Sequence, residues 1–242
     1  MLLWSENLRG YRLPIMSDPN VAKSVAAKMA AALVEDGMCL GLGSGSTFLL
    51  VVEELARRIR DEGIKISGVP TSSGTEKAAL AAGISIVSLE DVGELDLAID
   101  GADEIDPQKN MIKGGGAALV REKIVAAAAR EMVVVVDENK LVDTLGKAFA
   151  LPIEVMAFGV RQAEAAIAKT GCEPVLRRKD GEPLITDNGN YIIDCNYGGI
   201  DDPAALHDRL NALPGVLDNG LFVGMAGRVL VGHQNGQEQV LP

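Results

Sequence analysis

The sequence predicts an α/β fold, with a doubly wound, mainly parallel sheet of Rossmann-like type and a smaller, ferredoxin-like α+β domain. Short apolar runs of strand length alternate with helical patterns from residue 21 to residue 136, which is typical of a parallel sheet covered by helices. After Gly146 the expected order becomes strand, helix, strands, helix, strand, as in ferredoxin-like units. The 242 residues are 48% hydrophobic but only 3% aromatic, the composition of an aliphatic, soluble α/β chain.

The larger predicted domain consists of residues 1–149 and 224–242. Apolar residues at helical spacing predict helices over 21–35, 48–59 and 71–82, and a further helix from about Ala117. Short apolar and β-branched runs predict strands over 38–42, 65–70, 84–89, 95–100 and 132–136. A last hairpin over 228–241, with a turn at Asn235, is expected to rejoin this domain. Residues 1–15 carry charges throughout, so we expect a loosely held leader rather than a signal peptide.

The smaller predicted domain consists of residues 150–223. Strands are expected over 151–155, 173–178, 191–195 and 216–223, and helices over 161–169 and 202–213. Asp201 or Asp202 is expected to cap the second of these helices, with Pro203 in its first turn. Residues 184–186, a turn at 187–190 and the strand from 191 suggest a hairpin.

Charge and the rarer side chains narrow the class of function. With 23 basic and 34 acidic residues the net charge is −11, and no basic run offers a general footprint for nucleic acid or an anionic membrane. No segment approaches transmembrane length. Cys39, Cys172 and Cys195 are odd in number and far apart, which indicates reduced thiols and a cytoplasmic location. His207 and His233 are isolated, which disfavours zinc sites and Ser-His-Asp catalysis.

A loop rich in glycine and serine, GLGSGST at residues 41–47, lies between a predicted strand and a predicted helix. This order is typical of a phosphate cradle, because the backbone amides and the hydroxyl groups can reach the same anion. The glycine spacing does not match the dinucleotide fingerprint, and no Walker sequence follows. The loop therefore favours a sugar phosphate over a nucleotide, while a tight turn that merely needs glycine is its other interpretation.

Carboxylates and a lysine follow the strand predicted over 95–100. Asp100, Asp103 and Glu104 are expected to gather at the carboxyl edge of the sheet, where parallel sheets bind ligands. Lys113 then precedes three glycines and a helix, whose first amides favour negative charge. Neighbouring carboxylates are also the usual ligands of magnesium, so a metal site at these three acids remains the alternative to metal-free chemistry.

Glu122 is the candidate general base. Its neighbours three and four residues away on the helix cannot pair with a carboxylate; they are Ala118, Leu119, Val125 and Ala126. Burial on such an apolar face would raise the pKa of Glu122 toward working pH, as a general base requires. The alternative is an ordinary surface glutamate on an alanine-rich helix.

Three segments together carry a family resemblance: GLGSGST at 41–47, DGADE at 100–104 and KGGGAALVREK at 113–123. In this order and spacing the chain resembles ribose-5-phosphate isomerase of the A type. The resemblance continues through DENK at 137–140, LPIEV at 151–155, ITDNGN at 185–190 and LPGV at 213–216. A small departure is Ser44, which stands where the family commonly has threonine.

The resemblance implies interconversion of D-ribose 5-phosphate and D-ribulose 5-phosphate through an enediolate, in the non-oxidative pentose phosphate pathway, without metal or cofactor. It implies Glu122 as the proton acceptor, with Asp100, Asp103 and Lys113 as further catalytic residues. A homodimer or homotetramer is expected. The implied substrate-binding residues are Lys23, Ser44, Gly45, Ser46, Thr47, Asp100, Gly101, Ala102, Asp103, Lys113, Gly114, Gly115, Gly116 and Lys140.

Two other classes of function stay open on the residues alone. A non-catalytic sugar-phosphate sensor could use the same loop and lysines, but it would have no use for Glu122 on an apolar face. An enzyme like a CoA transferase could share the architecture and would use a glutamate as a covalent nucleophile.

Overall fold

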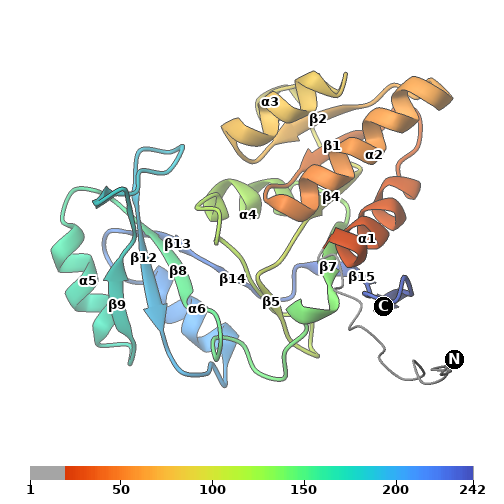
Figure 1. Ribbon diagram of the computed structural model, residues 1–242. Helices are drawn as coiled ribbons and strands as arrows, with labels where there is room; N and C mark the ends of the chain where they lie inside the picture. The colour runs from red at the N-terminus through yellow and green to blue at the C-terminus, as the bar shows by residue number, and fades with distance from the viewer. Residues whose placement is uncertain (1–19, 242) are drawn as a thin grey trace, which may run out of the picture.

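The computed structural model describes residues 20–241, so the leader expected at 1–15 lies outside the described residues. A seven-stranded sheet with the strand order β16-β15-β7-β4-β1-β2-β3 forms its centre (Figure 1). Every neighbouring pair in it is parallel except β15 and β16. The predicted doubly wound, mainly parallel sheet is confirmed. Its strands are β1 (Cys39–Leu42), β2 (Ser67–Pro70), β3 (Ser85–Ile86), β4 (Leu97–Asp100), β7 (Met132–Asp137), β15 (Ala226–Gly232) and β16 (Glu238–Leu241).

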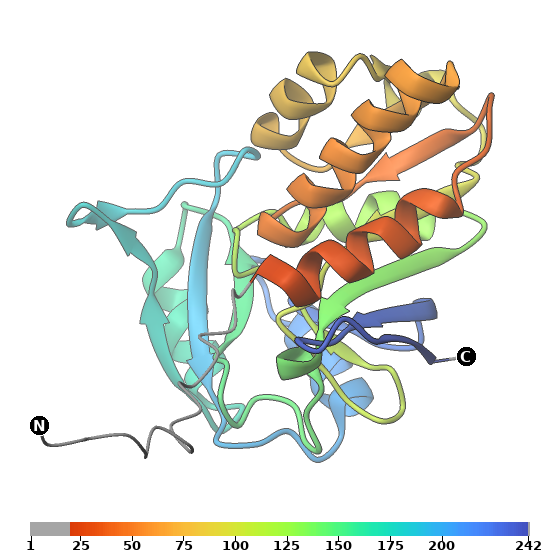
Figure 2. The same cartoon turned by 45° about the vertical axis from the view of Figure 1, so that its right-hand side comes forward.

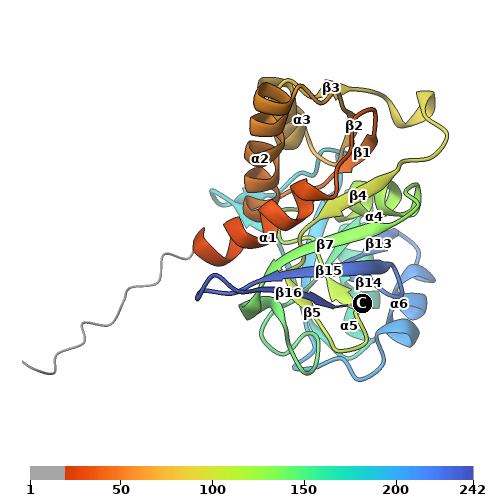
Figure 3. The ribbon, with the colours of Figure 1, turned by 90° about the vertical axis from the view of Figure 1, so that its right-hand side faces the viewer.

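Helices cover both faces of this sheet (Figures 1 and 3). One face packs against α1 (Asn20–Ala32), α2 (Ser46–Glu62) and α3 (Ser73–Ala81), and the other against α4 (Leu119–Ala127) and a small three-stranded sheet. Along β7, Val133 and Val135 join the first core, whereas the alternate valines join the second. Because both faces are buried, this strand is a continuous apolar run, which is why the sequence predicted it well.

The predicted last hairpin also forms and rejoins the large sheet, because β15 runs parallel to β7 (Figure 3). The strand expected over 84–89 is shorter, and a 3₁₀ helix, η1 (Leu89–Asp91), follows it. A second 3₁₀ helix, η2 (Glu138–Lys140), follows β7 and carries Lys140 at the carboxyl edge. Within residues 20–241, no helix is both long and apolar enough to cross a membrane.

A second, four-stranded antiparallel sheet has the order β13-β8-β12-β9, with its helices packed on one face (Figure 2). Strand, helix, strand, strand, helix, strand in this spatial order is the expected ferredoxin-like arrangement. Asp202 caps the second helix by accepting a hydrogen bond from the amide of Ala205. The division of the chain at 150 and 223 stays a prediction. The elements are β8 (Leu151–Val155), α5 (Val160–Ala168), β9 (Glu173–Leu176), β12 (Tyr191–Asn196), α6 (Pro203–Asn211) and β13 (Val216–Asn219).

The single strand predicted over 216–223 is wrong, because the chain changes sheets at Gly220. β13 ends there, and β14 (Leu221–Phe222) enters a three-stranded sheet with β6 (Met111–Ile112) and β5 (Glu104–Ile105). A Cβ at Gly220 would lie 2.3 Å from the carbonyl oxygen of Lys113, so only glycine allows this close crossing. The amide of Lys113 donates to the Gly220 carbonyl at 2.9 Å, which ties the segment after β6 to this crossing.

The hairpin expected across the turn at 187–190 is reduced to one bridge between Ile185 and Tyr191. The turn itself forms, with the amide of Thr186 donating to the carbonyl of Asn190. The regular hairpin lies just before it, between β10 (Arg178–Lys179) and β11 (Glu182–Pro183). Figure 2 shows the loop before β12, which holds the turn at 187–190, extending toward α3; there the Ser73 amide donates to Asp187 Oδ2 at 2.7 Å.

Candidate active site

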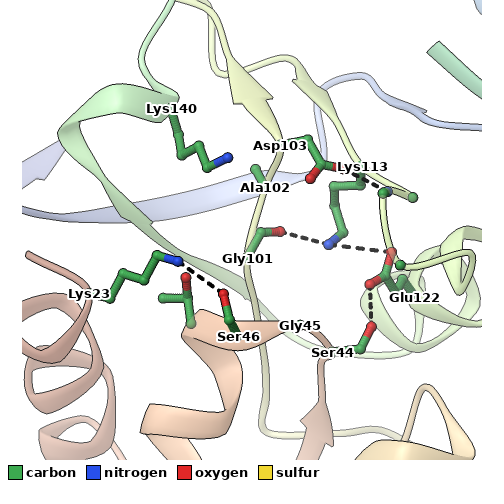
Figure 4. A pocket seen from close by; sticks show the side chains of 14 residues that line it. Lys23, Ser44, Gly45, Ser46, Gly101, Ala102, Asp103, Lys113, Glu122 and Lys140 are labelled. Atoms are coloured by element: carbon green, nitrogen blue, oxygen red, sulfur yellow. Dashed lines mark hydrogen bonds and ion pairs between the residues drawn. The ribbon is translucent and has the colours of Figure 1, made fainter. Parts of the chain in front are cut away.

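The pocket at the carboxyl edge of the large sheet gathers segments that are far apart in the sequence (Figure 4). Parallel strands end at the same edge, so the loops after β1, β4 and β7 meet there. Its volume of about 120 Å³ is small beside the roughly 300–1,000 Å³ of pockets for drug-sized ligands, and it suits a small metabolite better than a dinucleotide or coenzyme A. The lining residues are Lys23, Ser44, Gly45, Ser46, Thr47, Gly101, Ala102, Asp103, Lys113, Gly114, Gly115, Gly116, Glu122 and Lys140.

Every residue expected to bind substrate lines this pocket except Asp100, which lies just beneath it. Asp100 ends β4 and is buried. Its Oδ1 accepts hydrogen bonds from the amides of Ser44 at 3.0 Å and Gly101 at 2.8 Å. A Cβ on Gly43 would lie 2.3 Å from this carboxyl group, so the middle glycine of the GLGSGST loop is required for Asp100 to approach. The loop therefore serves as a close-packed wall of the site.

Glu122 is buried on α4, with 6% of its surface exposed, as the apolar face predicted. The helical neighbours leave it without a partner, but Ser44 Oγ donates a 2.6 Å hydrogen bond to its Oε1. Its Oε2 makes no hydrogen bond to the described residues and lies 3.4 Å from Lys113 Nζ. Sequence reasoning missed the Ser44 contact because 78 positions separate the two residues.

The pKa of Glu122 is raised to about 7. Burial is the largest cause, because it disfavours the charged form, and the negative charge of Asp100 adds to it. The positive charge of Lys113 and the hydrogen bond from Ser44 act in the opposite direction. The carboxyl group is therefore poised to take up and release a proton near neutral pH.

Lys113 is a buried cation between the two carboxylates. Its Nζ lies 2.9 Å from Asp100 Oδ2 and donates a 2.6 Å hydrogen bond to the carbonyl of Gly101. Burial lowers the pKa of Lys113, but the charges of Asp100 and Glu122 outweigh burial and raise it above its ordinary value. The ring of Phe222, with its centroid 5.5 Å from Nζ, adds a cation–π contact. Lys113 therefore keeps its charge at neutral pH.

The three glycines after Lys113 form a loop rather than the first turn of a helix. Gly114 has a φ of 102° and Ala117 a φ of 61°, and α4 begins only at Leu119, two residues later than expected. Asp103 Oδ2 accepts a 2.8 Å hydrogen bond from the amide of Gly115. This contact holds the glycine loop against the wall that Asp103 provides.

The prediction that Glu104 joins Asp100 and Asp103 is wrong. Glu104 is buried in β5, and its carboxylate accepts hydrogen bonds from the amides of Gly146 at 2.7 Å and Phe149 at 3.0 Å. Neighbouring residues of an extended chain point to opposite sides, which carries Glu104 away from the pocket. Across residues 20–241, no group of three or more His, Cys, Asp and Glu side chains is placed to hold a metal. The ammonium group of Lys113 on Asp100 also repels a cation there.

The other end of the pocket is cationic. Lys23 on α1 donates a 3.0 Å hydrogen bond to Ser46 Oγ, and Lys140 lies at the same end (Figure 4). Thr47, the residue after Ser46 on α2, also lines the pocket. Ser46 begins the 17-residue helix α2, and its N-cap residue Gly45 provides no side-chain cap for the first amides. Free amides and two lysines make this end suitable for a phosphate group, despite the net charge of −11.

Curated relatives are similar to almost the whole chain. A family model described as ribose 5-phosphate isomerase A (phosphoriboisomerase A) matches residues 67–236. The ribose-5-phosphate isomerase A of Thermosynechococcus vestitus is 50% identical over 232 residues, which cover 93% of this chain and 98% of the relative. The ribose-5-phosphate isomerase A 1 of Oceanobacillus iheyensis is 46% identical over 220 residues, which cover 91% and 98%.

Solved structures agree with these relatives. The ribose 5-phosphate isomerase A of Methanocaldococcus jannaschii matches with a TM-score of 0.86 at 43% identity, covering 90% of this chain and 97% of that one. A D-ribose-5-phosphate isomerase in complex with phospho-erythronic acid matches with a TM-score of 0.87 at 41% identity, covering 90% and 96%. With the same fold, and with sequence similarity to curated relatives over 91% and 93% of its length, the chain belongs to the ribose 5-phosphate isomerase A family.

Proposed function

We propose that this chain interconverts D-ribose 5-phosphate and D-ribulose 5-phosphate, with Glu122 transferring the proton between the two carbons. The observation that carries the proposal is the buried carboxyl group of Glu122, 3.4 Å from the buried ammonium group of Lys113, in a setting that raises its pKa to about 7. The names of the relatives support the same reaction. They also favour it over the sensor and the CoA transferase that the residues alone left open.

In the proposed reaction Glu122 moves one proton and no electrons leave the sugar. The ionised carboxylate removes the proton from C2 of the open-chain aldose, the C2 electrons form the C1–C2 double bond, and O1 becomes an oxyanion. The carboxylic acid then returns a proton to C1, while the hydroxyl proton of O2 passes to O1 and C2 becomes the carbonyl carbon. A base with a pKa near working pH suits both halves of this cycle.

The oxyanion that forms at O1 and O2 needs fixed donors in a place that excludes water. Lys113 keeps its charge there, and Gly116, whose N–H can serve as a second donor, also lines the pocket. Preorganised donors of this kind are typically worth roughly 3–4 kcal/mol each in the transition state. Asp103, which also lines the pocket, is suited to orient a sugar hydroxyl group or to assist ring opening.

The phosphate group is proposed to bind at the cationic end, against Lys23, Ser46, Thr47 and Lys140. The solved relative holds phospho-erythronic acid, which combines a phosphate group with a carboxylate group. In this pocket the carboxylate would stand in for the enediolate oxygens near Lys113, and the phosphate would lie at the other end. Phospho-erythronic acid is therefore expected to inhibit this chain competitively.

The proposal is tested by assaying ribose 5-phosphate turnover in wild type and in Glu122→Gln. The amide keeps the shape of the side chain but cannot accept the proton, so kcat should fall by at least about 1,000-fold with little change in KM. Glu76→Gln, an exposed change of the same kind on α3, should leave kcat unaltered. Turnover of Glu122→Gln close to wild type would refute the assignment.

A second measurement follows the transferred hydrogen. In deuterium oxide the enediolate route should place solvent deuterium at C1 of ribulose 5-phosphate, because the proton on Glu122 exchanges with solvent. Deuterium at C1 would exclude direct hydride transfer between the carbons, because a transferred hydride does not exchange with water. A covalent acyl adduct on Glu122 would instead support the transferase alternative.

A cytoplasmic location and assembly into a homodimer or homotetramer complete the proposal. Large apolar side chains remain exposed on the single chain, including Phe158 at 90% and Met156 at 49%, and association of copies would cover such surface. Sedimentation velocity of the purified protein distinguishes two or four copies from one.

A further inference from the structure

We infer that Arg177, held by Asp194, is a positioning residue that presets the peptide groups of the glycine loop, Gly114–Gly116, for the reaction. The inference rests on the proposed function of the pocket, which this loop lines. Arg177 itself does not line the pocket, so it acts through the loop rather than on the substrate.

Arg177 directly follows β9 of the four-stranded sheet, and its guanidinium group connects this sheet to the glycine loop. Its Nη1 donates hydrogen bonds to the carbonyl oxygens of Gly114 and Gly115, both at 3.0 Å. On the other side, its Nε and Nη2 donate to the two carboxylate oxygens of Asp194 at 2.8 and 2.5 Å. The side chains of Arg177 and Asp194 are only 15% and 25% exposed. A planar guanidinium fork can make these four contacts at once, whereas a lysine cannot.

These contacts decide which way the loop peptides face. The peptide group between Gly114 and Gly115 is held at both ends, because its carbonyl accepts from Arg177 and its N–H donates to Asp103 Oδ2 at 2.8 Å. The carbonyl and the N–H of a planar trans peptide point in opposite directions. Because the Gly115 carbonyl is turned to Arg177, the N–H of Gly116 is directed away from the guanidinium group. Arg177 thus selects the orientation of two successive loop amides.

A loop of three glycines needs such a restraint. Glycine takes positive and negative φ about equally readily, and Gly114 is found at a φ of 102°. Inside the loop, the carbonyl of Gly114 also accepts from the amide of Ala117, which closes a single turn. The remaining anchors come from outside the loop, from Asp103 on one side and Arg177 on the other. Without Arg177 the amides would have to be ordered during the reaction, and that cost falls on the transition state.

The test compares Arg177→Ala with Arg178→Ala. Arg178 is the exposed neighbour, and its guanidinium group donates to the carbonyl of Gly181 within its own hairpin, so it is a matched control. For Arg177→Ala, kcat for ribose 5-phosphate should fall about 10- to 100-fold, because misplacing a positioned group by about 1 Å can cost on the order of 100-fold. KM should stay within about threefold, since the phosphate end of the pocket is untouched. Arg178→Ala should match wild type in both constants.

A second readout separates positioning from damage to the fold. The inhibition constant of phospho-erythronic acid should rise for Arg177→Ala by about the factor lost in kcat/KM, whereas that of inorganic phosphate should not change. Partial unfolding would lower kcat by reducing the number of active molecules and would leave both inhibition constants at their wild-type values. Arg177→Lys should recover only part of the activity, and added guanidinium ion should partly rescue Arg177→Ala.

Two results would overturn the inference. One is a kcat/KM for Arg177→Ala within about twofold of wild type, and the other is a loss of kcat with an unchanged inhibition constant for phospho-erythronic acid. If Arg177→Ala does not fold, Asp194→Asn applies the same test, since it keeps the size of the side chain but removes its charge, and a smaller change in the same direction is expected. Wild-type turnover is measured first, so a chain without isomerase activity would refute the proposed function rather than the role of Arg177.

Discussion

The variant Ser44→Ala tests the environment of the proposed base by removing one atom. Ser44 Oγ donates a 2.6 Å hydrogen bond to Glu122 Oε1. This bond favours the ionised carboxylate, so it holds the pKa of Glu122 down against the effect of burial and of the charge on Asp100. Removing the hydroxyl group should therefore raise the pKa of Glu122 above its present value of about 7.

The size of the effect follows from the energy of the bond. A hydrogen bond to a charged group contributes roughly 1.5–3 kcal/mol, and about 1.4 kcal/mol corresponds to one pH unit. Even the lower value moves the acid limb of the kcat/KM profile upward by about one pH unit. At pH 7 the ionised fraction of Glu122 then falls from about one half to about one tenth, and kcat/KM falls about fivefold. At pH 9 Glu122 is mostly ionised in both wild type and Ser44→Ala, so the difference in kcat/KM between the two enzymes should nearly vanish.

The assay is the initial rate with ribose 5-phosphate from pH 5.5 to 9.5 for wild type, Ser44→Ala and Ser44→Thr. The threonine variant keeps the hydroxyl group, so its acid limb should coincide with that of wild type. All three share the titration of the substrate phosphate, which therefore cancels in the comparison. An acid limb at the same pH in Ser44→Ala, or a loss that is equal at pH 7 and pH 9, would show that the hydrogen bond does not control the pKa of Glu122.

Three further predictions concern stability, packing and phosphate binding. Glu122→Gln should raise the free energy of unfolding by about 3 kcal/mol at pH 8 and hardly at all at pH 4, measured by urea unfolding. The reason is that the pKa of Glu122 rises from 4.5 to about 7 on folding, so the folded wild type loses stability as pH rises through that window. An equal gain in the free energy of unfolding at pH 4 and pH 8 would contradict the effect of burial on Glu122. Gly43→Ala should lower kcat at least about tenfold, because its Cβ would lie 2.3 Å from the Asp100 carboxyl group. Gly93→Ala is the control, since a Cβ there meets open space and kcat should not change. Lys23→Ala should raise KM for ribose 5-phosphate about tenfold with a smaller change in kcat. Lys28 is an exposed lysine on the same helix, and an equal rise in KM for Lys28→Ala would argue against phosphate binding by Lys23.

Elements whose signal is local were predictable from the sequence. β7 is a continuous apolar run because helices and the three-stranded sheet bury both of its faces, and α6 begins with the expected cap at Asp202. Gly220 shows the limit of such signals. The residues around it read as one strand, but close contact with the carbonyl of Lys113 sends the two halves into different sheets. Glu104 likewise appeared to belong to the acidic cluster, until the orientation of its strand turned it toward Gly146.

The amino-acid order by itself determined the chemical components of the site. Helix periodicity and glycine chemistry act over a few residues, so they can be read without coordinates. They identified an acid on an apolar helix face, a lysine before three glycines, and the GLGSGST loop with its hydroxyl groups. Only the tertiary structure decided how these components meet. Ser44 and Lys113 reach Glu122 from other loops, and the pKa of about 7 depends on those contacts and on burial. Arg177 reaches Gly114 and Gly115 from the second sheet, and no local sequence pattern predicts a contact between segments more than sixty residues apart.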